Sequence, residues 1–301
     1  MRRFVTFVFA ALLLAACSEE ESGQTPGPVT DPTDAVADTA QDASGDTGSA
    51  TDGSLDDLAS PGDAISEPDP GPPACPAAGV EVVTFETADG LTLEADLHRT
   101  DATASAAVIL LHMIPPGNDR TNYPLSFREK LHEAGFTVLN VDRRGAGGSE
   151  GVATDAYQGP NGKLDAAAAV SALTALPCPP DLSRLAIIGA SNGTTTALDY
   201  ALHAAKNPEE DPVPRAMVFL TGGPYTENQN ELGAVLENPE LDEVPILFVY
   251  PQDEASWSES YKDTATHWTH KAYEQSGHGT HLFDSAPVSM TDVTEWLVDA
   301  L

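Results

Sequence analysis

Positive charge is scarce in this sequence. The 301 residues include 14 Lys and Arg against 47 Asp and Glu, which gives a formal net charge of −33 at pH 7. No Lys or Arg occurs between Phe4 and His98. Such a chain lacks the basic surface that neutralises phosphate groups, so we expect no nucleic-acid partner.

Cysteine is scarce as well, with Cys17, Cys75 and Cys178 as its three occurrences. None of them has the spacing of a metal site, and no His/Cys cluster occurs, so we expect neither a metal nor another cofactor. Cys75 and Cys178 both lie beside prolines in predicted loops. In an exported chain we expect them to form a disulfide at the start of the folded domain, with two free thiols as the alternative.

Residues 1–16 have the pattern of a bacterial lipoprotein signal peptide. Met1, Arg2 and Arg3 precede an apolar stretch that is too short for a permanent membrane span. The following Leu-Ala-Ala-Cys resembles a lipobox, which implies a lipid on Cys17, and Ser18 after it implies the outer membrane of the cell envelope. We expect membrane contact through this lipid anchor alone. The alternative is an ordinary cleaved signal with an incidental cysteine.

Residues 17–74 are expected to form an acidic, disordered tether. They consist almost entirely of Asp, Glu, Ser, Thr, Gly, Ala and Pro, and such a segment buries too little apolar surface to offset the entropy of ordering. Most of the 47 acidic residues lie outside it. We therefore expect the remainder, residues 75–301, to be a folded domain that is itself acidic.

Within 75–301, predicted strands alternate with predicted helices. Two extended runs in 80–99 flank an Asp-Gly turn and predict an antiparallel hairpin. The apolar run 106–112 is typical of a strand buried on both faces. Alternation from there to the end predicts an α/β domain with a mostly parallel central sheet and helices on both faces. No stretch is long enough for a large cap domain.

A candidate nucleophile lies in residues 187–193, Ile-Ile-Gly-Ala-Ser-Asn-Gly. A Gly-x-Ser-x-Gly turn after an apolar strand, followed at once by helix-forming residues, predicts a sharp elbow that exposes the Ser191 hydroxyl above the sheet. The five-residue pattern alone is weak, because glycine and serine are common. The alternative is a glycine-rich turn with an idle serine.

A second loop, 112–117, follows the buried strand and can contribute to an oxyanion hole. Backbone N–H groups aimed at a developing oxyanion stabilise the transition state of acyl transfer. We expect the two donors to be the N–H groups of Met113 and of Asn192, the residue after the serine, with Ile114 as the alternative to Met113. A proline-rich loop without this geometry is the competing interpretation.

Five blocks in order resemble the α/β-hydrolase superfamily, and in particular serine members of its dienelactone-hydrolase-like branch. They lie at 111–115, 142–149, 189–193, 245–253 and 277–280, within a resemblance that covers about residues 80–301. The resemblance implies the α/β-hydrolase fold. The glycine-rich block at 142–149 lacks a phosphate-binding lysine pattern. We expect it to be a structural turn supported by Asp142 and Arg144.

In this superfamily the catalytic residues occur in the order serine, acid, histidine. The resemblance implies Ser191 as the nucleophile and Asp253 as the acid, because Asp253 follows the end of a late predicted strand by three residues. Glu254 is the rival acid, and Asp263 is a weaker one.

For the base, the same order implies His278, which lies between two glycines after a predicted last strand at 271–275. It would take the serine proton and return it to the leaving group. The alternatives are His267 and His270, which fall in a predicted helix, and His281, which comes three residues late.

These residues imply a serine hydrolase that cleaves a small-molecule carboxylic ester through an acyl-enzyme. Dienelactone hydrolases proper use cysteine where this chain has Ser191, so lactone specificity is not expected to transfer. One alternative is a peptidase or amidase of the prolyl-oligopeptidase type, although no propeller-like sequence precedes the domain. Another is a non-catalytic binding module on the same fold.

Overall fold

The computed structural model describes residues 75–301 except 103, 224 and 226–231. The predicted signal peptide (1–16), the predicted tether (17–74) and the predicted lipidation at Cys17 lie outside the described residues. In the described part, none of the helices combines the length and the apolar character that crossing a membrane requires.

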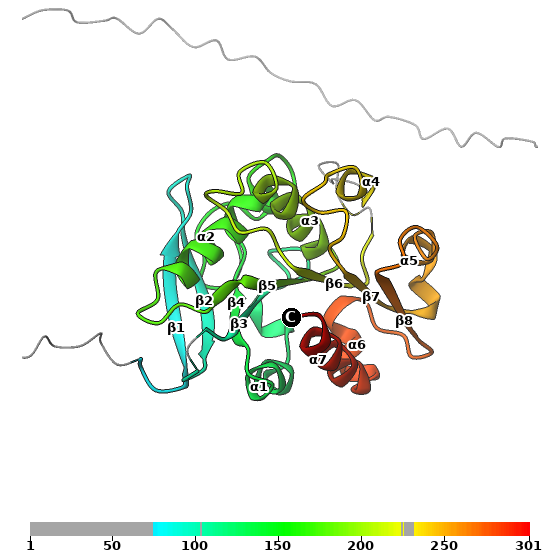
Figure 1. The fold of residues 1–301 in the computed structure, drawn as a ribbon, viewed down its shortest axis with the longest axis horizontal. Helices are drawn as coiled ribbons and strands as arrows, with labels where there is room; N and C mark the ends of the chain where they lie inside the picture. Colours follow the sequence, from blue (N-terminus) through cyan, green and yellow to red (C-terminus); the bar gives the residue numbers. More distant parts are fainter. Residues whose placement is uncertain (1–74, 103, 224, 226–231) are drawn as a thin grey trace, which may run out of the picture. The chain divides into compact units, whose positions relative to one another are not determined.

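The core element is an eight-stranded sheet in the order β1-β2-β4-β3-β5-β6-β7-β8 (Figure 1). β1 and β2 form an antiparallel hairpin, β2 pairs antiparallel with β4, and all other neighbours are parallel. The predicted hairpin and the mostly parallel sheet are therefore confirmed. The strands are β1 Gly79–Glu86, β2 Thr92–Arg99, β3 Ala106–Leu111, β4 Thr137–Val141, β5 Asp181–Ala190, β6 Ala216–Leu220, β7 Ile246–Pro251 and β8 Trp268–Tyr273.

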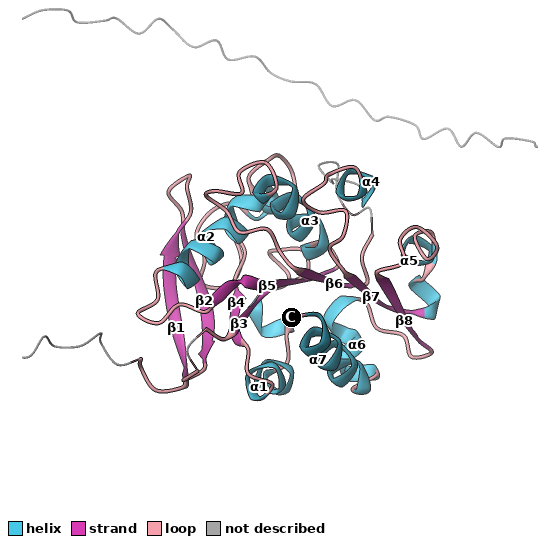
Figure 2. Ribbon diagram, in the orientation of Figure 1, coloured by secondary structure: helices cyan, strands magenta, loops and turns pink. Residues whose placement is uncertain are grey.

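Helices cover both faces of the sheet (Figure 2). One face carries α2 (Gly162–Thr174), α3 (Gly193–Ala204), α4 (Leu232–Leu236) and the short α5 (Ser256–Glu259). The other carries α1 (Leu125–Glu133), α6 (Leu282–Ser285) and α7 (Val288–Ala300). The connections between strands hold no cap domain in the part that the structure describes. The 3-10 helices are η1 Arg120–Asn122, η2 Ala153–Ala156, η3 Gln252–Glu254 and η4 Gly279–His281.

The central strands are buried on both faces because helices pack against each side. Every residue of β3, β4 and β6 is buried. Since side chains alternate along a strand, Ile109 joins the core under α2 and α3, while Val108 and Leu110 join the core under α1 and α7. The continuous apolar runs in the sequence follow from this two-sided burial.

Two predicted elements differ from the structure near the end of the chain. The last strand begins at Trp268, earlier than predicted, and so His270 lies in β8 rather than in a helix. His267 directly precedes this strand. The predicted helix there is wrong because threonine and tryptophan favour a pleated, half-buried strand over a helix.

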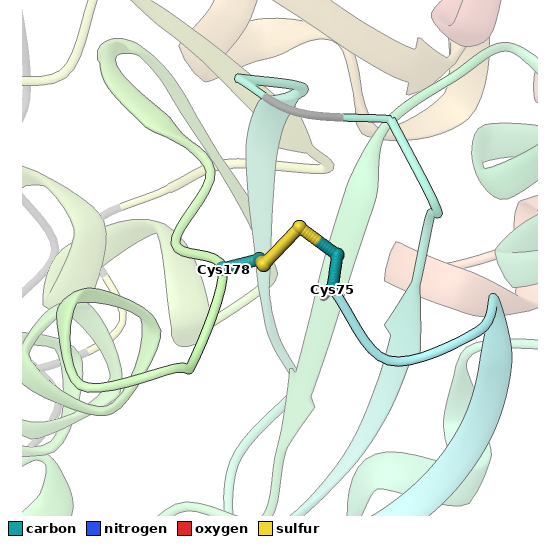
Figure 3. The surroundings of a disulfide bond; sticks show 2 residues. All are labelled: Cys75 and Cys178. Carbon is teal, nitrogen blue, oxygen red and sulfur yellow. A yellow bond between two sulfur atoms is a disulfide. The ribbon is translucent and has the colours of Figure 1, made fainter. Parts of the chain in front are cut away.

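A disulfide joins Cys75 to Cys178, with 5.5 Å between their Cα atoms and a sequence separation of 103 (Figure 3). Cys75 precedes β1, and Cys178 lies in the loop between α2 and β5. The pairing expected from the sequence is therefore present in the structure. It ties the first described residues to the middle of the domain.

Candidate active site

Ser191 lies at a strained turn between β5 and α3. Its φ of +49° is in the left-handed region, which non-glycine residues adopt rarely. A Cβ at Gly189 would lie 2.6 Å from the Gly193 carbonyl carbon, and a Cβ at Gly193 would lie 2.2 Å from the Leu111 carbonyl oxygen. Both glycines of the Gly-x-Ser-x-Gly pattern are therefore needed so that the turn can pack against β3 and the start of α3.

The Ser191 hydroxyl meets the imidazole of His278. Their Oγ and Nε2 atoms lie 2.7 Å apart, although the two residues have a sequence separation of 87. The Ser191 N–H donates to the Leu220 carbonyl at the end of β6, which anchors the turn to the neighbouring strand. The structure thus brings together the serine and the histidine that the sequence indicated.

The carboxylate on His278 comes from Glu254 and not from Asp253. Glu254 Oε2 lies 2.5 Å from His278 Nδ1, whereas the Asp253 carboxylate accepts a hydrogen bond from Ser276. Both acids lie in η3, directly after β7. Successive side chains in a 3-10 helix point about 120° apart, so the two neighbours cannot face the same imidazole. The prediction that Asp253 contacts the histidine is wrong, and the alternative acid, Glu254, makes this contact instead.

The remaining alternatives lie away from this arrangement. His270 stacks on Phe248, with ring centroids 4.4 Å apart. His267 precedes β8, His281 is exposed in η4, and Asp263 is exposed beyond α5. None of these side chains has a hydrogen bond to Ser191 or His278 among the described residues.

The contacts of His278 are consistent with one tautomer. An ionised Glu254 carboxylate can accept a hydrogen bond but cannot donate one. His278 Nδ1 therefore carries the proton, and Nε2 is free to accept from the Ser191 hydroxyl. Both partners of the hydrogen bond between His278 and Glu254 are partly exposed, at 35% for the His278 side chain and 39% for Glu254. The relay therefore lies at the surface end of the site, while Ser191 is 5% exposed.

Thr221 supports the histidine loop and was missed by sequence reasoning. Its φ is +51°, which is unusual for a β-branched residue. Its hydroxyl accepts from the Gly279 N–H at 3.0 Å, and its carbonyl accepts from the Tyr225 hydroxyl at 2.6 Å. No local sequence signal marks a threonine in this conformation, because the contacts come from distant parts of the chain.

Tyr225 borders the imidazole of His278. The two rings meet edge to face, with centroids 5.6 Å apart. Burial, together with the nearby Glu254 charge, raises the pKa of Tyr225 well above its usual range, so its hydroxyl stays protonated and can donate.

Of the predicted oxyanion donors, Asn192 is next to Ser191 in the chain, and the loop that carries Met113 begins close to the same turn, since a Cβ at Gly193 would lie 2.7 Å from the His112 carbonyl oxygen. Asn192 directly precedes the first residue of α3, and the N–H groups of Met113, Ile114 and Asn192 donate to no other group in the described part of the chain. Met113 is buried, and its sulfur lies against Gly279, whereas the Ile114 side chain is 40% exposed. The assignment of the first donor to Met113 rather than Ile114 stays a prediction.

The glycine-rich loop after β4 is a structural turn, as expected. The Asp142 carboxylate accepts from the N–H groups of Arg120 and Gly148 at 2.7 and 2.8 Å. Arg144 pairs with Asp165 at 2.7 Å. Sequence reasoning assigned no role to Arg143, whose guanidinium is buried beneath the turn of Ser191. Its contacts are tertiary, and no sequence motif indicates them.

No protein-family model matches this sequence, and no curated protein matches it. Solved structures do. An esterase of Pyrococcus furiosus is 18% identical, with a TM-score of 0.55, over 74% of this chain and 91% of that one. A dienelactone hydrolase of Anabaena variabilis is 19% identical, with a TM-score of 0.51, over 74% and 96%. An esterase of Pyrobaculum calidifontis is 15% identical, with a TM-score of 0.53, over 74% and 86%. The chain therefore has the α/β-hydrolase fold and resembles these esterases and this dienelactone hydrolase in structure.

Proposed function

We propose that this protein is a serine hydrolase that cleaves carboxylic esters through an acyl-enzyme. The observation that carries the proposal is the continuous contact from Ser191 Oγ through the His278 imidazole to the Glu254 carboxylate. The three side chains follow β5, β8 and β7, so they meet at the carboxyl edge of the parallel sheet, where ligands bind in open α/β sheets. Likeness of fold to esterases agrees with this chemistry.

The acylation step follows from the positions of the atoms. Ser191 Oγ attacks the acyl carbonyl carbon while its proton passes to His278 Nε2, 2.7 Å away. The carbonyl oxygen becomes negative and accepts from the N–H of Asn192 and from that of Met113 or Ile114. As the tetrahedral intermediate collapses, the carbon–oxygen bond to the alcohol breaks, and His278 gives its proton to the departing oxygen.

Deacylation repeats these steps with water. His278 takes a proton from water, the resulting hydroxide attacks the acyl carbon, and the carboxylic acid departs as the proton returns to Ser191. Throughout, the Glu254 carboxylate holds the Nδ1 proton and stabilises the imidazolium when it forms. All of these proton transfers use side chains of this chain.

The test combines labelling with turnover. A fluorophosphonate should label the wild-type protein at Ser191 and should leave Ser191→Ala unlabelled, and His278→Ala should react much more slowly. The wild type should hydrolyse p-nitrophenyl esters faster than aminoacyl p-nitroanilides. Hydrolysis of the anilides alone would instead support a peptidase. A folded wild type with neither labelling nor turnover would support a non-catalytic binding module.

We also propose that the mature protein is anchored by a lipid on Cys17, with residues 17–74 as the tether. The support is the Leu-Ala-Ala-Cys sequence after a short apolar stretch. Mass spectrometry of the mature amino terminus should show an acylated Cys17 as the first residue. An unmodified residue at that position would rule out the anchor.

A further inference from the structure

Arg143 is fully buried directly beneath the two peptides that are proposed to hold the oxyanion. Its Nη1 donates to the Asn192 side-chain oxygen at 2.8 Å and to the His112 and Met113 carbonyl oxygens at 3.2 and 3.4 Å. One guanidinium nitrogen therefore contacts both sides of the oxyanion hole.

The carbonyl contacts bear on the oxyanion donors themselves. The His112 carbonyl belongs to the same peptide unit as the Met113 N–H, and the Met113 carbonyl belongs to the same unit as the Ile114 N–H. Because a trans peptide is planar, its C=O and N–H point in opposite directions. A hydrogen bond that fixes the carbonyl on the buried side therefore fixes the N–H on the other side. This holds whichever of the two residues donates.

His112 adds a second link from Arg143 to the same loop. The Arg143 N–H donates to His112 Nε2 at 2.9 Å, so the imidazole proton lies on Nδ1 and is donated to the Met113 carbonyl at 2.7 Å. Burial, reinforced by the Arg143 charge, lowers the pKa of His112 to about 3. The imidazole is therefore neutral, as this chain of hydrogen bonds requires.

The guanidinium has no carboxylate partner in the described part of the chain. Of its other two nitrogens, Nη2 donates to the Ala156 carbonyl at 2.8 Å and to the Thr196 hydroxyl at 2.7 Å, whereas the buried Nε has no hydrogen-bond partner among the described residues. The Asp165 charge acts on Arg143, but the Asp165 carboxylate is paired with Arg144. A buried cation whose direct partners are neutral acceptors is costly to fold, and its charge is offset only in part.

We propose that Arg143 is a positioning residue of the oxyanion hole. It orients the loop donor through the carbonyl of the donor's own peptide unit and orients Asn192 through its side chain. Its positive charge, which no carboxylate contacts directly among the described residues, favours the oxygen as it becomes negative in the transition state. This inference rests on the proposed esterase chemistry of Ser191.

The test compares Arg143→Met with a control variant, Arg144→Met. Arg144 is the next residue in the chain and is equally buried, but it pairs with Asp165 and Asp89. For Arg143→Met we expect kcat on a p-nitrophenyl ester to fall by about 10- to 100-fold, somewhat less than for loss of an oxyanion donor, with little change in KM. Inhibition by an aryl trifluoromethyl ketone, whose adduct carries an oxyanion, should weaken by a similar factor. Arg143→Lys should recover part of kcat, and Arg144→Met should lower the melting temperature while leaving kcat near the wild-type value.

Asn192→Ala provides a second route if Arg143→Met fails to fold. It removes the Oδ1 acceptor but keeps the Asn192 N–H, and we expect a smaller fall in kcat with a correspondingly smaller weakening of the ketone inhibitor. Unchanged kcat and ketone inhibition in a folded Arg143→Met, or in Asn192→Ala, would overturn the inference. Failure of the proposed function would differ, because the wild type itself would then neither hydrolyse esters nor react with a fluorophosphonate at Ser191.

Discussion

The Glu254 carboxylate lies 2.5 Å from Nδ1 of His278, while its chain neighbour Asp253 bonds Ser276 instead. This pair of adjacent acids offers a matched comparison, because both are exposed and both lie in η3. We therefore expect the direction in which each side chain points to account for their different effects on catalysis.

We expect Glu254→Gln to reduce kcat on esters by about 100-fold or more, because an amide can favour the wrong imidazole tautomer and cannot stabilise an imidazolium. Asp253→Asn should leave kcat within about three-fold of the wild type, since it alters a contact outside the relay. Steady-state kinetics at pH 8 measures both. A larger loss in Asp253→Asn than in Glu254→Gln would contradict the assignment of the acid.

Ser191 could be predicted because it lies in a local pattern that forces a geometry, whereas His278 could be predicted from the residue order that the family resemblance implies. The two glycines around Ser191 are required by contacts below 3 Å, and such a requirement is visible as a motif. The choice between Asp253 and Glu254 was not predictable, because it depends on the rotation of one short turn. Arg143 was not predictable either, since its partners lie in the loop after β3, in η2, just before α3 and in α3, and their convergence exists only in the folded chain.

The nucleophile turn should tolerate no side chain at Gly193. A Cβ there would lie 2.2 Å from the Leu111 carbonyl oxygen, which belongs to the rigid β3 backbone. We expect Gly193→Ala to lower the unfolding free energy by about 3 kcal/mol or to prevent folding. Gly233→Ala is the control, because a Cβ at this position in α4 meets nothing within 4 Å. Urea denaturation of both variants decides this, and equal stability would show that the turn can relax.

Stability should fall as the pH is lowered from 7.5 to 5, in part because of His98. This imidazole is buried, and burial, followed by the nearby Arg128 charge, lowers its pKa to about 4. In the unfolded chain the His98 imidazole is protonated as the pH falls below about 6.5, whereas in the folded chain it stays neutral until about pH 4. Between these two pH values the unfolded chain binds more protons, so acid favours unfolding. In His98→Phe the unfolding free energy should depend less steeply on pH between 7.5 and 5. An unchanged slope would show that other groups account for the effect.

The disulfide should stabilise the domain by restricting the unfolded chain. Cys75 and Cys178 have a sequence separation of 103, and for a loop of this size chain entropy gives about 4 to 5 kcal/mol. The double variant Cys75→Ala/Cys178→Ala should lose stability of this order in urea denaturation while keeping its fold. Treating the wild type with a reducing agent should produce the same loss and should leave the double variant unchanged. Sensitivity of the double variant to the reductant would point to another cause.

Thr221 should affect catalysis through the position of His278. Its hydroxyl accepts a hydrogen bond from the Gly279 N–H, and Gly279 is buried. Thr221→Ala therefore leaves a buried donor without a partner, which costs about 1 to 3 kcal/mol of folding free energy. That cost falls on the segment that carries His278, so we expect ester kcat and fluorophosphonate labelling to slow together, by about ten-fold, with KM little changed. Thr221→Ser keeps the hydroxyl and should retain most of the rate. If the alanine and serine variants were equally slow, the methyl group rather than the hydrogen bond would hold the loop.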